Sequence, residues 1–144
     1  DQFRFAFQKV NKDFTFTIKI DSLYNTHQYA KAGIMIRKSL NTNSAHGLIN
    51  IFPNGNTEFG FRNNNGETMK ATSGPQIDLQ NAKLKMKKWG ETVEFFVIKN
   101  NNWEKIGKLD ITKWGKSFYV GLATLSHDNS KLTKAQYSEI NLNQ

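Results

Sequence analysis

The sequence contains no cysteine among its 144 residues. This absence excludes thiol nucleophiles, Cys-x-x-Cys redox pairs, zinc ribbons and cysteine-ligated iron–sulfur clusters. A chain of this length buries roughly 68% of the surface that its unfolded form exposes, so the fold requires neither a disulfide nor a structural metal. The mean hydropathy is −0.62, and an apolar run of about 18 residues, the signal of a membrane span, is absent. We therefore expect a single domain over residues 1–144 and no membrane partner.

The sequence also lacks a recognisable signal peptide. It begins at Asp1 and continues directly into alternating phenylalanines at Phe3, Phe5 and Phe7. We expect a module excised from a longer protein, with the targeting sequence and the attached domains outside this chain.

Arginine is scarce although the chain is strongly basic. The net charge is +8, yet only Arg4, Arg37 and Arg62 are arginines. Recognition of bases and phosphates relies on the bidentate guanidinium fork, which lysine cannot replace. The densest lysine cluster, at residues 83–88, alternates with apolar residues in the manner of a solvated strand face. The sequence therefore predicts no nucleic-acid partner.

Helical periodicity is missing, and alternation with a period of two dominates. It is strict in residues 14–20, 58–62 and 84–87. Turn clusters rich in Asn, Gly and Pro separate such segments along the whole chain. The pattern predicts about eleven short strands and very little helix, which corresponds to an all-β fold made of two antiparallel sheets in a β-sandwich.

Motifs for catalysis are absent as well. The sequence has no Gly-x-Ser-x-Gly elbow and no phosphate-binding glycine loop. The carboxylate pairs Glu91/Glu94 and Glu104/Asp110 do not have the spacing that glycoside hydrolysis needs on one strand. We expect a protein that is not an enzyme.

Metal-binding motifs are equally lacking, because His27, His46 and His127 form no His-x-His or His-Glu-x-x-His arrangement. No cofactor is expected. A structural calcium ion stays open, because five aspartates fall near strand ends or turns, where oxygen ligands can converge, although the chemistry of turns is the favoured explanation of such aspartates. They are Asp13, Asp21, Asp78, Asp110 and Asp128.

Strand parity indicates a binding surface. In the consecutive segments 33–37, 45–51 and 58–62, we expect the isoleucines and phenylalanines to point into the core, so the alternate side chains face outward. If the segments form a meander, these outward side chains share one sheet face. They would form a patch of planar donors and acceptors suited to sugars, or a solvated face held by cross-strand pairs. They are Arg37, His46, Asn50, Glu58 and Arg62.

An aromatic platform would complete such a site by stacking on a sugar ring. Tyr29 is one candidate, and Trp89, Trp103 and Trp114 are others, with packing favoured for Trp103. His127 follows the segment 119–126 and can reach the rim of a site or bond a loop carbonyl.

Several segments resemble concanavalin A-like β-sandwich modules of the lectin and glucanase type, found in secreted bacterial proteins. The most specific is Ala30-Lys31-Ala32-Gly33-Ile34-Met35-Ile36-Arg37, in which Tyr29 stands where the family often has Trp. The other matching segments are Asp13–Thr17, Ser44–His46, Phe59–Arg62, Trp103–Gly107 and Tyr119–Ala123 with Ser126-His127. The resemblance implies a jelly-roll fold, a non-catalytic role, carbohydrate as the ligand and an extracellular location.

Two functions remain open from the sequence. The first is a carbohydrate-binding module that targets an attached extracellular enzyme or surface protein to a glycan, and the +8 charge makes acidic polysaccharides reasonable ligands to screen. The alternative is a structural or protein-interaction module of a secreted or cell-surface protein without a glycan site.

Overall fold

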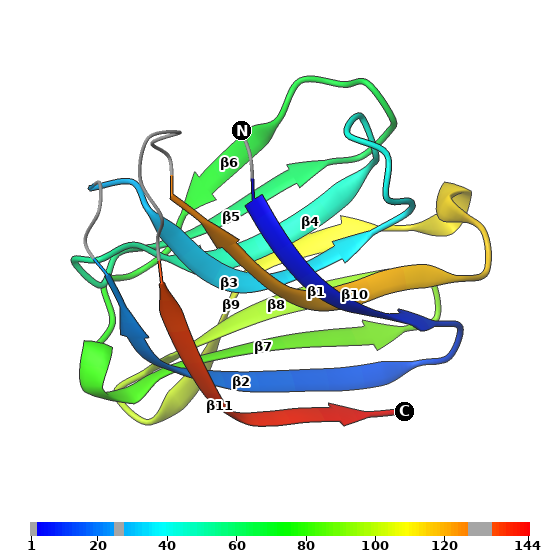
Figure 1. Ribbon diagram of the computed structural model, residues 1–144. Coiled ribbons are helices and arrows are strands. Elements are labelled where there is room, and N and C mark those ends of the chain that lie inside the picture. Colours follow the sequence, from blue (N-terminus) through cyan, green and yellow to red (C-terminus); the bar gives the residue numbers. More distant parts are fainter. Residues whose placement is uncertain (1–2, 25–27, 127–133) are drawn as a thin grey trace.

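The computed structural model describes residues 3–24, 28–126 and 134–144. These residues form two antiparallel β-sheets packed face to face, with only two single-turn 3-10 helices, Leu79–Asn81 and Thr112–Trp114 (Figure 1). Within the described part of the chain, no helix has the length and hydropathy of a membrane span. The predicted all-β sandwich of antiparallel sheets is confirmed.

Six strands in the order β1-β10-β3-β4-β5-β6 make one sheet, which we call the front sheet. Its strands are β1 (Phe3–Val10), β10 (Phe118–Leu125), β3 (Lys31–Arg37), β4 (His46–Ile51), β5 (Thr57–Arg62) and β6 (Lys70–Ser73). The order β3-β4-β5-β6 is the predicted meander.

Five strands in the order β11-β2-β7-β8-β9 make the other sheet, which we call the back sheet. They are β11 (Ala135–Asn143), β2 (Phe14–Leu23), β7 (Ala82–Trp89), β8 (Thr92–Lys99) and β9 (Asn102–Asp110).

The core lies between the two sheets and follows from the alternation in the sequence. Strands β2, β7 and β8 bury every second residue, so each contributes one apolar row to the core. The alternate, outward row is mainly polar on β2 and β7, whereas on β8 it includes Phe96 and Ile98. Aromatic rings fill the middle: Phe59 lies 5.1 Å from Phe61 and 4.6 Å from Phe95 between ring centroids.

Strands β3 and β4 depart from this pattern because nearly all their residues are buried. A second apolar cluster explains the departure. Met35 and Leu48 pack with Ala123, Leu125 and Phe5 on the outer face of the front sheet. The middle of the front sheet therefore buries side chains on both of its faces.

Candidate functional site

The outer face of the front sheet carries the polar residues that strand parity predicts. Arg37 pairs with His46, and His46 pairs with Arg62, so these three residues form one row across β3, β4 and β5. Asn50 and Glu58 are paired in a second row, nearer the start of β3. The prediction that the five residues share one sheet face is confirmed.

The predicted exposure of this face is wrong for three of the five residues. Arg37 is 3% exposed, His46 is 7% exposed and Asn50 is fully buried. The physical reason is that strand parity determines which face a side chain takes, whereas its exposure depends on what else lies on that face. Here backbone carbonyls after β3 and β5 approach the arginine row, and the second apolar cluster occupies the middle.

The Arg37 guanidinium donates hydrogen bonds to backbone carbonyls in the connection that follows β3. Its Nε donates to the Ser39 carbonyl at 3.1 Å, and its Nη2 donates to the Asn41 carbonyl at 2.6 Å. Arg62 does the same from β5: its Nε donates to the Glu67 carbonyl at 2.7 Å, and its Nη1 donates to the Thr42 carbonyl at 3.2 Å. Charge-assisted bonds of this kind hold the loops against the sheet.

His46 lies between the two guanidinium groups and is neutral at physiological pH. Burial lowers its pKa to about 4, and the charges of Arg37 and Arg62 act in the same direction, while a hydrogen bond with the Ser44 carbonyl opposes them. Because Nδ1 faces that carbonyl at 3.1 Å, Nδ1 carries the proton and Nε2 is left as an acceptor. The imidazole cannot serve here as a cation.

Asn50 is unusual on this face because its side-chain amide is buried without hydrogen bonds to the described residues. Its side-chain oxygen and nitrogen are both buried, and neither has a hydrogen-bond partner among the described residues. A buried amide without partners costs roughly 1–3 kcal/mol. Native structures rarely retain such a group without a reason, and a ligand or water that satisfies the amide is one such reason.

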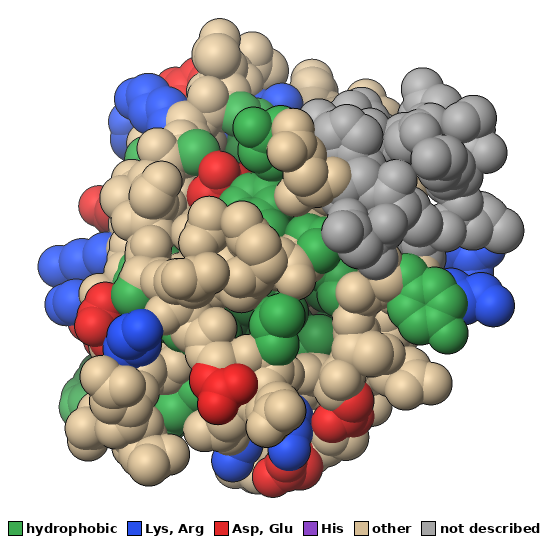
Figure 2. Space-filling view, turned by 90° about the vertical axis from the view of Figure 1, so that its left-hand side faces the viewer, with side chains coloured by type: hydrophobic (Ala, Val, Ile, Leu, Met, Phe, Trp, Pro, Cys, Tyr) green, Lys and Arg blue, Asp and Glu red, His purple; other side chains and the backbone are tan. Residues whose placement is uncertain are grey.

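An open cavity lies beside Glu58, at the end of the sandwich where β3 begins and β4 ends. Its volume is about 520 Å³, which falls within the roughly 300–1,000 Å³ range of small-ligand sites. Figure 2 looks onto this end of the sandwich, where uncharged polar groups and backbone predominate and hydrophobic side chains show between them. The cavity is lined by Gln28, Tyr29, Lys31, Phe52, Asn54, Asn56, Glu58, Ser73 and Gly74.

Two predicted site residues meet in this cavity. Tyr29 is half exposed and meets the ring of Phe52 edge-on, with 6.0 Å between centroids. Glu58 accepts a hydrogen bond from Lys31, with 3.1 Å between Nζ and Oε1. The Lys31 ammonium also lies 5.6 Å from the centroid of the Phe52 ring. An aromatic surface thus stands beside a fixed donor and acceptor pair.

The remaining predicted aromatic platforms lie elsewhere. Trp114 is 4% exposed and belongs to the core, while Trp89 is 72% exposed at the end of β7. Trp103 is on β9 and 38% exposed, so it belongs to the back sheet and is not buried as core packing requires. His127 lies outside the described residues.

Sequence reasoning missed most of the cavity lining. Lys31 belongs to the segment that carries the family resemblance, but its alternation with Gly33 was the only signal that it shares the face of Glu58. Phe52, Asn54 and Asn56 belong to the turn between β4 and β5, where asparagine is expected for turn geometry alone. Local pattern cannot show that this turn and the residues before β3 enclose one cavity.

Among the described residues, no three His, Asp or Glu side chains gather as a metal site would require. Asp13 pairs with Lys88, Asp78 accepts from the Gln80 amide, and Asp110 accepts from Thr112. Asp128, another of the predicted calcium ligands, lies outside the described residues.

Comparisons with solved structures show the fold. A protein from Saccharomyces cerevisiae described as functionally unknown is 14% identical, covers 99% of this chain and 75% of its own, and superposes with a TM-score of 0.74. The carbohydrate-binding module CBM66 from Bacillus subtilis is 15% identical over 95% of this chain and 78% of its own, with a TM-score of 0.57. Sheep galectin-11 is 12% identical over 91% of this chain and 96% of its own, with a TM-score of 0.50.

The sandwich is also used by an enzyme. Scytalido-glutamic peptidase is 9% identical over 94% of this chain and 74% of its own, with a TM-score of 0.51. No protein-family profile matches the sequence, and no curated protein matches it either. At these identities the likeness establishes the architecture, and function must be argued from the site.

Proposed function

We propose that this domain is a non-catalytic carbohydrate-binding module and that its sugar site is the cavity beside Tyr29. The observation that carries the proposal is the combination of an exposed tyrosine ring with the Lys31–Glu58 pair in one cavity of about 520 Å³. A sugar presents an apolar ring face together with several hydroxyl groups, and this cavity offers a complement to both.

The polar lining has the chemistry that hydroxyl groups require. The Glu58 carboxylate accepts hydrogen bonds, the Lys31 ammonium donates them, and the amides of Asn54 and Asn56 can do both. Asn54 and Asn56 occupy a turn held by the hydrogen bond from the Phe52 amide to the Asn56 carbonyl, at 2.8 Å. A rigid turn reduces the conformational entropy that binding would otherwise cost.

The named neighbours add support of a general kind. One is a carbohydrate-binding module and another is a galectin, and both share the sandwich with this chain. The sequence resemblance to concanavalin A-like modules supports an extracellular setting, in which the domain would hold an attached enzyme or surface protein on a glycan. The +8 charge makes acidic glycans a sensible part of any screen.

A thermal-shift screen against neutral and acidic oligosaccharides tests the proposal. A ligand present at one hundred times its Kd stabilises the folded state by about 2.7 kcal/mol, which raises the melting temperature measurably. The shift should disappear in Tyr29→Ala and persist in Trp89→Ala, which removes a more exposed ring at a distant end of the sandwich. No shift with any sugar would contradict the proposal.

Strand β1 favours a second candidate function, that of a protein-interaction module. It is the edge strand of the front sheet, and Phe3 and Phe7 on it are 37% and 48% exposed. An edge with exposed aromatic side chains is a template for pairing with another chain. Sedimentation velocity over a concentration series tests this: the candidate predicts association of the wild type and a monomer for Phe7→Ser.

A further inference from the structure

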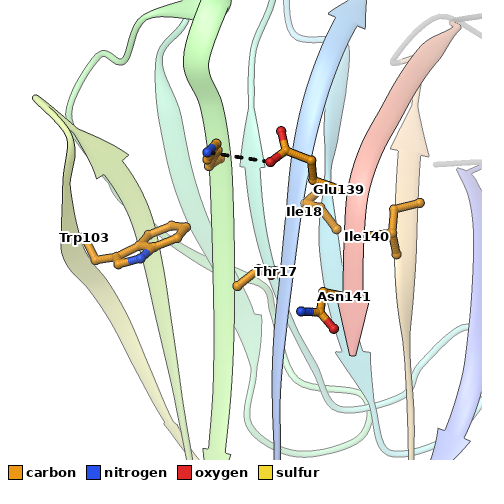
Figure 3. A pocket seen from close by; sticks show the side chains of 7 residues that line it. Thr17, Ile18, Trp103, Glu139, Ile140 and Asn141 are labelled. Atoms are coloured by element: carbon orange, nitrogen blue, oxygen red, sulfur yellow. Dashed lines mark ion pairs between the residues drawn. The ribbon is translucent and has the colours of Figure 1, made fainter. Parts of the chain in front are cut away.

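The outer face of the back sheet holds a second hollow, whose lining shares no residue with that of the Tyr29 cavity. Its volume is about 340 Å³, and it is lined by residues of β2, β7, β9 and β11. Figure 3 shows its construction: Thr17 lies at the base, the Trp103 ring stands on one side, and Glu139 and Asn141 stand on the other. None of these residues belongs to the front sheet.

A distortion of β11 shapes one wall of this hollow. The pairing between β11 and β2 shifts between Ser138 and Asn141, and Glu139 has a φ of 48°. Positive φ is uncommon for a residue with a side chain, and bulges often redirect a side chain next to a functional site. Here the carboxylate is directed over the sheet, 4.0 Å from the Lys19 ammonium and 3.9 Å from that of Lys83.

Lysines dominate the charge of this face. Strand β7 presents Lys83, Lys85 and Lys87 at alternate positions, and β9 adds Lys105 and Lys108. Glu94 is paired with Lys105 at 3.1 Å. Within the described residues, no carboxylate forms an ion pair with Lys85 or Lys87. Lys87 is opposite Glu94 in the pairing of β7 with β8, and its ammonium lies 5.5 Å from the centroid of the Trp89 ring.

Lys85 is held in an unusual position. Its ammonium lies 4.5 Å from the centroid of the Phe96 ring and 4.7 Å from that of the Trp103 ring. Partial burial lowers its pKa, and the charge of Lys87 acts in the same direction while that of Glu94 opposes it. Two aromatic faces hold the cation in place, and an anion binding there would offset the repulsion between the two lysines.

We propose that this face, centred on Lys85 and Trp103, is a second binding surface that takes the anionic sugar of an acidic polysaccharide, either a uronate or a sulfated residue. The sugar's carboxylate or sulfate would contact Lys85, with Lys87 adding to the positive charge nearby, and its ring would lie in the hollow beside Trp103. The face carries no arginine, and phosphate and base recognition favour arginine. We therefore favour an acidic glycan over a nucleic acid.

The lysine row suits a polymer because it follows the strand. Alternate residues on one strand recur every ~7 Å, so Lys83, Lys85 and Lys87 present a line of charges. The proposal does not depend on the Tyr29 cavity, since the two sites lie on opposite sheets. A negative result for one of the two sites therefore does not contradict the proposal for the other.

Titrations followed by NMR test the proposal, with a heparin-derived hexasaccharide and a hexagalacturonate as probes. We expect the indole N–H signal of Trp103 to shift with at least one probe and not with a neutral hexasaccharide. Lys85→Gln should weaken binding about tenfold, as the loss of one charge-assisted contact implies. Trp103→Ala should weaken it as well, whereas Lys85→Arg should largely retain it.

The control is Lys12→Gln, which removes the same charge from an exposed lysine in the turn before β2. Thermal melts of every variant establish that it folds. The proposal is overturned if Lys12→Gln weakens binding as much as Lys85→Gln, because the effect would then be one of net charge alone. It is also overturned if neither probe binds, or if single-stranded DNA or anionic phospholipid vesicles compete as well as the probes.

Discussion

Lys31 and Glu58 meet at 3.1 Å across the outer face of the front sheet, although β4 separates the two strands that carry them. Both side chains are roughly three-quarters buried, with 22% and 23% of their surfaces exposed. The pair is therefore held in one geometry, and its remaining donors and acceptors face the cavity that contains Tyr29.

Glu58→Gln should weaken sugar binding about tenfold, because a neutral amide accepts weaker hydrogen bonds than a carboxylate. Its stability should fall by no more than about 1 kcal/mol, the usual value of a partly exposed pair. Titration calorimetry and urea denaturation measure the two effects. With a neutral oligosaccharide as the ligand, Glu94→Gln is the matched control, since it breaks the Lys105–Glu94 pair of the same 3.1 Å length on the back sheet. Equal binding by both variants would argue against a role for Glu58.

Stability should depend on the ionisation of His46 between about pH 6.5 and pH 4. The pKa of His46 is lowered to about 4 in the folded protein, against about 6.5 in an unfolded chain. As the pH falls through this window the unfolded state binds a proton before the folded state does, so stability is lost on acidification, by about 3 kcal/mol in all.

Urea denaturation of the wild type and of His46→Gln at pH 7.5 and pH 4.5 measures this dependence. Carboxylates that titrate in acid affect both proteins equally, so the difference between them reports on His46. A wild type that loses no more stability than His46→Gln would show that the imidazole titrates normally.

Gly107→Ala should destabilise the protein by about 1–3 kcal/mol, the usual cost of overpacking a core. A Cβ atom at Gly107 would collide with the ring of Phe59, which is already packed against Phe61 and Phe95. Gly66→Ala is the comparison: its added carbon would meet nothing within 4 Å, and only its φ of 76° would be unfavourable. Melting temperatures should rank Gly107→Ala below Gly66→Ala, and the reverse order would contradict the described packing.

Lys88 and Asp13 offer a test of a buried charge. Lys88 is 8% exposed, and its ammonium donates to Asp13 at 2.9 Å. Asp13→Asn should lower the melting temperature, because it leaves that ammonium without a charged partner. Lys88→Met should be tolerated better, since an apolar chain of similar length removes the buried charge itself. A lower melting temperature for Lys88→Met than for Asp13→Asn would contradict this prediction, because it would show that the ion pair stabilises the fold by more than the desolvation of Lys88 costs.

The alternation of apolar and polar residues was sufficient to predict the sandwich and the β3-β4-β5 meander. Strand β6 was harder to recognise, because all four of its residues are exposed and the strand has no apolar row. Its pairing with β5 comes from backbone hydrogen bonds, which leave no pattern in the side chains.

The candidate site was predictable only in part. Parity placed Arg37, His46 and Arg62 on the correct face, but their burial depends on loop carbonyls that no local pattern reveals. Tyr29 and Glu58 were both predicted, yet their meeting in one cavity depends on three separate segments. The bulge at Glu139 was not foreseen, because a β-bulge depends on the pairing of two strands far apart in sequence.

Titration calorimetry with the oligosaccharide that gives the largest thermal shift tests whether the sugar binds in the Tyr29 cavity. We expect saturable binding by the wild type and loss of binding in Tyr29→Ala. Tyr29→Phe should be affected only slightly, because it keeps the ring, and Trp89→Ala should bind like the wild type. Binding by Tyr29→Ala with unchanged affinity would show that the sugar site is not this cavity.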